Sequence, residues 1–217
     1  MKRQQIGGIL WMGSCLYLPA QVLTALRWPR PYSWTDNFIS DLGVTACGVY
    51  PEPGLPTREI CSPWHAVFNT ATTLSGVLTV MGAVLLTGWW RGRCGWAGTA
   101  LVALHGSLTA LVGLLPWDRH PDAHNAVALW QAVALWCALG LLAVSTPGRF
   151  RYGTLAVAVV SVVGFALFTS AGVEASGLGI GGSERLAFDV PLLWFLLTGA
   201  AIALRPSPLG RRRSPKT

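Results

Sequence analysis

The sequence predicts an all-α integral membrane protein, a bundle of six transmembrane helices with both termini in the cytoplasm. Hydrophobic residues make up 52% of the 217 positions, charged residues only 12%, and tryptophan occurs 11 times. A soluble domain of this size would not stay in solution with that balance. Six charge-free apolar runs approach the roughly 20 residues that a bilayer-spanning helix needs. The uneven distribution of lysine and arginine between the loops predicts the orientation.

Each expected helix is an apolar run between polar segments. The first run follows a short basic start, yet it is too long for the apolar part of a cleaved signal peptide, so we expect it to remain as a helix. The longest polar segment is the loop of residues 27–64, so residues 1–217 form a single transmembrane domain, with residues 205–217 as a basic cytoplasmic tail. The expected helices cover about residues 6–26, 65–86, 97–115, 126–144, 155–171 and 190–204.

Charged residues separate by side. Eleven lysines and arginines fall on the side of the termini and five on the other, which predicts that both termini are cytoplasmic. The expected location is the plasma membrane. All nine acids fall on the outer side. The net charge of +7 therefore reflects topology and contact with anionic lipid headgroups on the cytoplasmic side, and it does not indicate nucleic-acid binding.

Polar side chains follow one face of the first expected helix. Their spacing of three and four residues predicts that this face looks into the bundle. Pro19 has no amide hydrogen and is expected to kink the helix near its outer third. The polar residues of this face are Ser14, Tyr17, Gln21 and Thr24.

The outer loop, residues 27–64, combines a polar first half with a second half rich in proline. Asp36 or Ser40 could cap a short amphipathic helix that lies on the mouth of the bundle. Cys47 and Cys61 are the only two of five cysteines on the outer side. This predicts a disulfide, because the compartment beyond a plasma membrane permits one. The alternative is two unrelated buried thiols.

The second and third helices carry further polar groups. The second has a polar stripe that begins at His65, and the third has His105 near mid-depth. An ionisable group inside a membrane is a functional candidate by default, although a neutral histidine bonded within the bundle is the simpler alternative. The side chains expected to contact a ligand are Gln21, Asn69, Thr73 and His105.

Residues 117–125 form a polar island between two apolar runs, at the turn of a helical hairpin. Imidazoles and carboxylates that lie at the same membrane face suit a divalent metal site or acid–base chemistry. A zinc ion could be held by His65, His120, His124 and Asp118 with a water at an open position, and the catalytic candidates are His65, Asp118, His124 and Asp41. A solvated loop without a site is the alternative. Haem does not fit, because it needs two histidines at equal depth on facing helices, whereas His105 lies about 15 Å below the outer end of its helix and His65 and His124 lie at the surface.

Residues 176–185 are rich in glycine and are expected to form a flexible outer loop. Their pattern resembles a dinucleotide-binding fingerprint only superficially, because no strand precedes it. Glu184 in this loop and Asp189 at the start of the last helix add carboxylates to the outer mouth.

Two short motifs stand in a fixed order along the helices: Ser40-Asp41-Leu42-Gly43, and Gly113-Leu114-Leu115-Pro116-Trp117-Asp118 with His124 shortly after. On these motifs the chain resembles the DUF998 family of small multi-pass membrane proteins over most of its length. The resemblance implies a helical membrane bundle and no assigned reaction. The membrane hydrolase superfamily that includes alkaline ceramidases also gathers His, Asp and Ser at one membrane face. It has seven helices and a late His-x-x-x-His, both of which this sequence lacks.

Three functions fit these observations. The first is a membrane protein that binds a small ligand or lipid through its polar outer mouth, favoured by the polar stripes and the lack of a strong catalytic motif. The second is a zinc-dependent intramembrane hydrolase acting on a lipid, which metal analysis of the purified protein would distinguish. The third is a small transporter, although no repeat relates the two halves of the sequence.

Overall fold

A computed structural model describes residues 2–51, 57–170 and 177–204. Within these residues, six helical segments are long and apolar enough to cross a membrane, which confirms the predicted class. The basic tail lies outside the described residues. The six spans are Arg3–Ala25, His65–Leu85, Gly92–Leu114, Pro121–Val144, Arg149–Phe168 and Gly179–Ala203.

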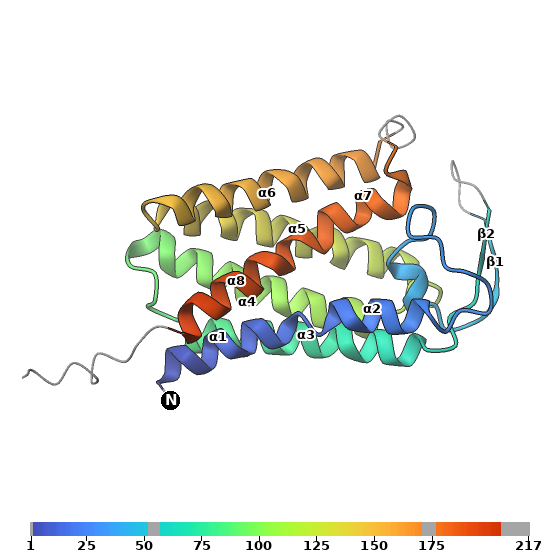
Figure 1. Cartoon of the computed structure of the whole chain (residues 1–217), viewed down its shortest axis with the longest axis horizontal. Helices are drawn as coiled ribbons and strands as arrows, with labels where there is room; N and C mark the ends of the chain where they lie inside the picture. Colours follow the sequence, from blue (N-terminus) through green and yellow to red (C-terminus); the bar gives the residue numbers. More distant parts are fainter. Residues whose placement is uncertain (1, 52–56, 171–176, 205–217) are drawn as a thin grey trace, which may run out of the picture.

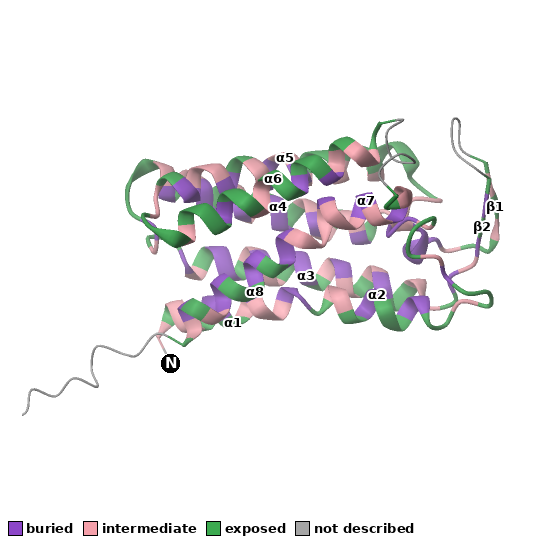
Figure 2. Ribbon diagram, turned by 45° about the horizontal axis from the view of Figure 1, so that its top comes forward, coloured by how far each residue is buried: buried purple, intermediate pink, exposed green. Residues whose placement is uncertain are grey.

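The helices form a ring in chain order (Figure 1). The first span pairs with α3 (His65–Leu85), which is followed round the ring by α4 (Gly92–Leu114), α5 (Pro121–Val144) and α6 (Arg149–Phe168). The last span lies beside α6 and also beside the first span, so the ring closes. Figure 2 shows buried and exposed residues on every helix. The large exposed side chains are mostly Leu and Val, as expected where helices face lipid.

The first span is two helices, α1 (Arg3–Ser14) and α2 (Tyr17–Ala25). Pro19 explains the break, because it has no N–H to offer the carbonyl of Cys15 four residues earlier. That carbonyl accepts the N–H of Leu18 instead, at 3.0 Å. The predicted kink is therefore present, but it lies near the middle of the span rather than in its outer third.

The last span is also broken, into α7 (Gly179–Phe188) and α8 (Val190–Ala203). Pro191 cannot donate to the carbonyl of Ala187, and a bare carbonyl is costly inside a membrane. The hydroxyl of Ser161 on α6 donates to it at 2.6 Å. One side chain of α6 thus satisfies the backbone group that the proline leaves free.

The prediction of a flexible loop at residues 176–185 was wrong from Gly179 onwards, because α7 begins at this residue. Ser176 lies outside the described residues. Glycine disfavours a helix in isolation, but here it allows close packing. Gly181 lies against backbone oxygens of Trp34 and Asn37, and its N–H donates to the carbonyl of Thr35 at 2.7 Å. Tertiary contacts therefore stabilise a helix that its composition does not favour.

α3 begins at His65, as predicted, but α4, α5 and α6 start earlier than predicted. α4 begins at Gly92 rather than residue 97, α5 at Pro121 rather than 126, and α6 at Arg149 rather than 155. An apolar run marks only the part of a helix that crosses hydrocarbon, and the helix continues into the headgroup region.

The cap consists of residues 26–51 and 57–64. Together with residues 115–120 it covers one end of the bundle, hereafter the capped end, and the described N-terminal residues lie at the opposite end (Figure 1). The cap contains an antiparallel pair of strands, β1 (Gly48–Tyr50) and β2 (Arg58–Ile60). The short helix expected near Asp36 and Ser40 is a single 3-10 turn, η1 (Ser40–Gly43).

An aromatic cluster fills the half of the bundle away from the cap. Trp11 is completely buried, and its ring centroid lies 5.2 to 5.8 Å from those of Trp90, Trp194 and Phe195. Its indole N–H donates to the carbonyl of Thr79 at 3.1 Å. Aromatic side chains therefore fill the interior around Trp11.

Candidate functional site

A cavity of about 510 Å³ lies inside the ring, in the half nearer the cap. Residues of η1 and of α2 to α8 line it. Much of its wall is aromatic, which suits an apolar ligand body. The aromatic lining residues are Tyr17, Phe38, Phe68, Trp117, Phe165, Phe168, Phe188 and Phe195.

Hydroxyl groups on α3 and α4 add polarity to this wall, mainly as acceptors. Thr72, Thr79 and Thr109 each donate their hydroxyl hydrogen to a carbonyl of their own helix, at 2.9 Å. The amide nitrogen of Asn69 donates to the carbonyl of Gly43 at 2.9 Å. The threonine oxygens and Oδ1 of Asn69 remain able to accept hydrogen bonds.

His105 stands at the deep end of the cavity. Its Nδ1 lies 3.0 Å from the carbonyl oxygen of Gln131 on α5. A carbonyl only accepts, so Nδ1 carries the hydrogen and Nε2 is an acceptor. The ring stacks on Phe195 with centroids 5.8 Å apart. His105 is thus a bonded, buried histidine and also part of the cavity wall.

His124 repeats this arrangement nearer the cap. Its Nδ1 lies 2.7 Å from the carbonyl oxygen of Leu115, which again makes Nε2 the acceptor. For neither histidine do the described residues supply a hydrogen-bond donor to Nε2. Two imidazoles at different depths therefore offer a lone pair to a ligand.

Glu184 is the one acid among the described residues that line the cavity. Its Oε2 accepts the N–H of Ile39 at 2.5 Å, which joins α7 to the cap. The sequence predicted Glu184 in a loop at the outer mouth and not among the catalytic, ligand-binding or metal candidates. The available signal was that residues 185–188 lead without a break into the last apolar run, so a helix begun earlier would carry Glu184 inside.

Asp41 lies outside the cavity and forms a buried ion pair in the cap. Its Oδ2 is 3.2 Å from Nε of Arg58, with the side chains 1% and 8% exposed. The same carboxylate accepts the N–H of Phe38 at 3.0 Å. Burial raises the pKa of Asp41 above its ordinary value, and the charge of Arg58 opposes that rise. Asp41 therefore orders residues 38–41 rather than facing a ligand.

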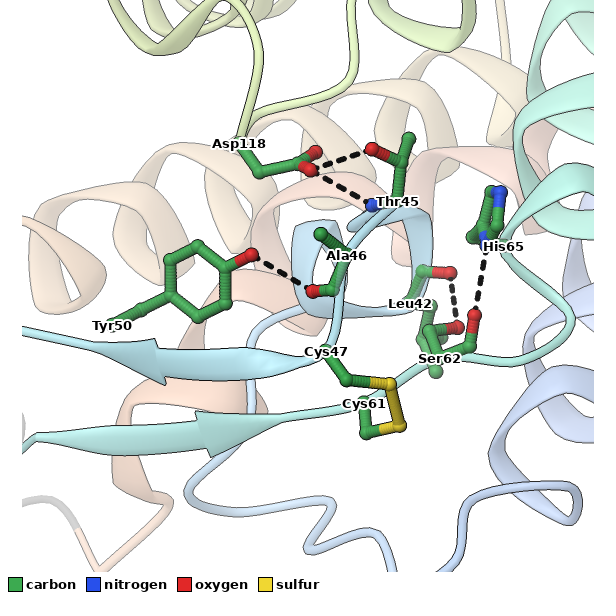
Figure 3. Close-up of a disulfide and its surroundings, with 9 residues drawn as sticks. All are labelled: Leu42, Thr45, Ala46, Cys47, Tyr50, Cys61, Ser62, His65 and Asp118. Atoms are coloured by element: carbon green, nitrogen blue, oxygen red, sulfur yellow. Dashed lines mark hydrogen bonds between the residues drawn. A yellow bond between two sulfur atoms is a disulfide. The ribbon is translucent and has the colours of Figure 1, made fainter.

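Two more of the predicted catalytic groups, Asp118 and His65, are also turned to the cap (Figure 3). Oδ2 of Asp118 accepts from the N–H and the hydroxyl of Thr45, at 3.0 and 2.7 Å. Nδ1 of His65 lies 2.9 Å from the carbonyl oxygen of Ser62. Beside them, Cys47 and Cys61 form a disulfide that joins the two strand segments. These contacts fasten the cap to α3 and to the turn between α4 and α5.

The structure does not bring the four predicted zinc ligands together. Within residues 2–51, 57–170 and 177–204, no three His, Cys, Asp or Glu side chains are placed to hold one metal ion. The physical reason is that His65, Asp118 and His124 each satisfy a different local partner, while His120 is exposed.

The predicted ligand-contacting residues divide in two. Asn69 and His105 line the cavity, whereas Gln21 and Thr73 do not. Gln21 donates to Oδ1 of Asp189 at 2.7 Å and so joins α2 to the α7–α8 junction. Thr73 donates to the carbonyl of Asn69 at 2.9 Å.

Six apolar helices around a partly polar cavity define a multi-pass helical membrane protein. The chain belongs to the family described as "Protein of unknown function (DUF998)", whose family model matches residues 12–201. This match covers most of the chain and confirms the predicted family. No curated protein and no solved structure matches the chain.

Proposed function

We propose that this protein binds a small, largely apolar molecule in its central cavity. The observation that carries the proposal is the cavity itself: its volume of about 510 Å³ lies within the range of known ligand sites, roughly 300–1,000 Å³. Its wall combines aromatic side chains with a few polar groups at defined positions, as such sites do.

The polar groups select for a ligand that donates hydrogen bonds. The ring N–H of His105, that of His124 and one amide N–H of Asn69 are committed to backbone carbonyls, and each side chain offers an acceptor. A ligand hydroxyl would satisfy such an acceptor, while a purely hydrocarbon ligand would leave it unpaired.

We also propose that the capped end faces outward at the plasma membrane and that both termini are cytoplasmic. The eleven-to-five excess of Lys and Arg on the side of the termini supports this orientation. The disulfide in the cap supports it independently, because disulfides persist outside the reducing cytoplasm.

A cavity-filling variant tests ligand binding. Ala128 lines the cavity, so Ala128→Phe should fill part of it, whereas Ala126→Phe, on an exposed position of the same helix, should not. Protein purified in native-membrane nanodiscs would be extracted and its small molecules identified by mass spectrometry. We expect one class of molecule enriched with the wild type and with Ala126→Phe, and reduced about tenfold or more with Ala128→Phe.

The unfolding midpoint of both variants, measured in the same nanodiscs, controls for loss of fold. Equal recovery of every molecule from a folded Ala128→Phe and from the wild type would refute binding in this cavity.

A further inference from the structure

One side of α5 packs against α6 in the middle of the bundle but is uncovered nearer the cap. Asn125, Leu129 and Trp136 share this side, since they are spaced by four and seven residues. The indole N–H of Trp136 donates to the hydroxyl of Ser161 on α6 at 2.8 Å, and its ring centroid is 5.3 Å from that of Phe165. α5 and α6 are thus in direct contact at this level.

Nearer the cap the same side of α5 is uncovered. Leu129 lines the cavity and is 41% exposed, and Asn125 also lines the cavity and is exposed. On α6, Phe165 and Phe168 line the cavity and are half-buried, and Thr169 lines it and is exposed. Residues that belong to both the cavity wall and the outer surface mark an opening between α5 and α6.

The cap closes the way in along the bundle axis. Phe38, Ile39, Ser40 and Gly43 form part of the cavity wall. This segment is held from two sides, by the bond from Ile39 to Glu184 and by the bond from Asn69 to Gly43. At the other end the aromatic cluster around Trp11 fills the interior.

Neighbouring seams are tightly packed. A Cβ at Gly164 of α6 would lie 2.6 Å from the backbone nitrogen of Ala187 on α7. A Cβ at Gly106 of α4 would lie 2.8 Å from the carbonyl oxygen of Gly76 on α3. These helix pairs leave no room for a side chain between their backbones, in contrast to the α5–α6 pair above Trp136.

The opening lies at hydrocarbon depth. Leu129 is eight residues into α5 from its start at Pro121, or about 12 Å along the helix axis, and three residues, or about 5 Å, inside the apolar run that begins at residue 126. The hydrocarbon core of a bilayer is about 30 Å thick. The opening therefore extends from the level of Asn125 and Thr169 into the acyl chains of the leaflet at the capped end.

Charge limits what can enter. No Lys or Arg is among the described residues that line the cavity, and its one acid, Glu184, already accepts a bond from Ile39. An anionic phosphate or carboxylate would therefore lose its hydration without gaining a cationic partner. The acceptors on His105 and His124 favour a neutral donor such as a hydroxyl.

We propose that the gap between α5 and α6 is a lateral portal, through which a single-chain lipid with an uncharged hydroxyl headgroup enters from the leaflet at the capped end. This rests on the proposed ligand-binding function and adds the route and the ligand class. The chain lies among the phenylalanines and the hydroxyl donates to an imidazole Nε2.

The test uses the full-length protein in phosphatidylcholine vesicles and a long-chain fatty alcohol with a photoreactive diazirine. After irradiation, labelled peptides are identified by mass spectrometry. We expect labels on residues 124–131 and 165–169. The matched fatty acid at a pH where it is ionised should label these segments much less. Equal labelling by the fatty acid would overturn the assignment of an uncharged headgroup.

Kinetics test the portal. Leu129→Trp should narrow the opening and slow labelling about fivefold after probe-loaded vesicles are added. Leu74→Trp is the control, because Leu74 is similarly exposed (45%) and lies nine residues into α3 from the capped end. It should label at the wild-type rate.

The outcomes separate the two proposals. If Ala128→Phe abolishes labelling of residues 124–131 while Leu129→Trp leaves its rate unchanged, the cavity binds lipid and the portal is wrong. If labels spread evenly over lipid-facing residues and no variant changes them, both the portal and the cavity function fail. Unfolding midpoints equal to that of the wild type confirm that both tryptophan variants are folded.

Discussion

Gly164→Ala should destabilise the bundle, because α6 and α7 approach each other at this glycine with backbone contact. The added Cβ would be 2.6 Å from the backbone nitrogen of Ala187, which is 0.8 Å short of the 3.4 Å at which ordinary contacts begin. The atoms it meets are backbone and the first side-chain carbon of Leu186, so they cannot rotate away. The two helices must separate instead.

The expected cost can be estimated from three terms. Overpacking costs about 1–3 kcal/mol, and the absence of a flexible neighbour favours the upper part of that range. Separation of the helices also stretches the bond from Ser161 to Ala187, which contributes about 1 kcal/mol. Alanine recovers about 1 kcal/mol of helix propensity. The net loss in the free energy of unfolding is about 2–3 kcal/mol.

The matched control is Gly140→Ala on α5. Among the described residues, no atom lies within 4 Å of a Cβ built at Gly140, so only the gain in helix propensity remains. Free energies of unfolding would be measured by reversible denaturation in mixed micelles with increasing sodium dodecyl sulfate. Gly140→Ala should equal or slightly exceed the wild type. A Gly164→Ala protein as stable as Gly140→Ala would refute the close packing of α6 on α7.

Two further predictions concern the cap and the orientation. Cys47→Ser and Cys61→Ser should lower the free energy of unfolding by similar amounts, about 3 kcal/mol in the chain-entropy model for a separation of 14 residues, and the double variant should be no worse. Additive losses in the same micelle assay would show two independent packing roles. Reporter fusions ending at Arg91 and at Trp117 should report the cytoplasm and the outside, respectively. An outside signal at Arg91 would reverse the proposed orientation.

Sequence alone determined the features that depend on local composition. The six spans follow from hydropathy, because a helix that crosses hydrocarbon requires a continuous apolar run. The break in the first span follows from Pro19, whose missing N–H acts within its own turn. The family also follows from short motifs whose order is read directly from the chain.

Only the tertiary structure decided the cavity and its chemistry. Which way His105 points depends on a carbonyl of Gln131, 26 residues away on another helix. Whether residues 179–188 are loop or helix depends on backbone groups of the cap that pack against Gly181. Three of the four predicted zinc ligands have separate partners instead: His65 and His124 bond to carbonyls of their own segments, and Asp118 bonds to Thr45, 73 residues away in the cap. Hydropathy and spacing sum over neighbours in the chain, while a cavity and a hydrogen-bond partner are set by neighbours in space.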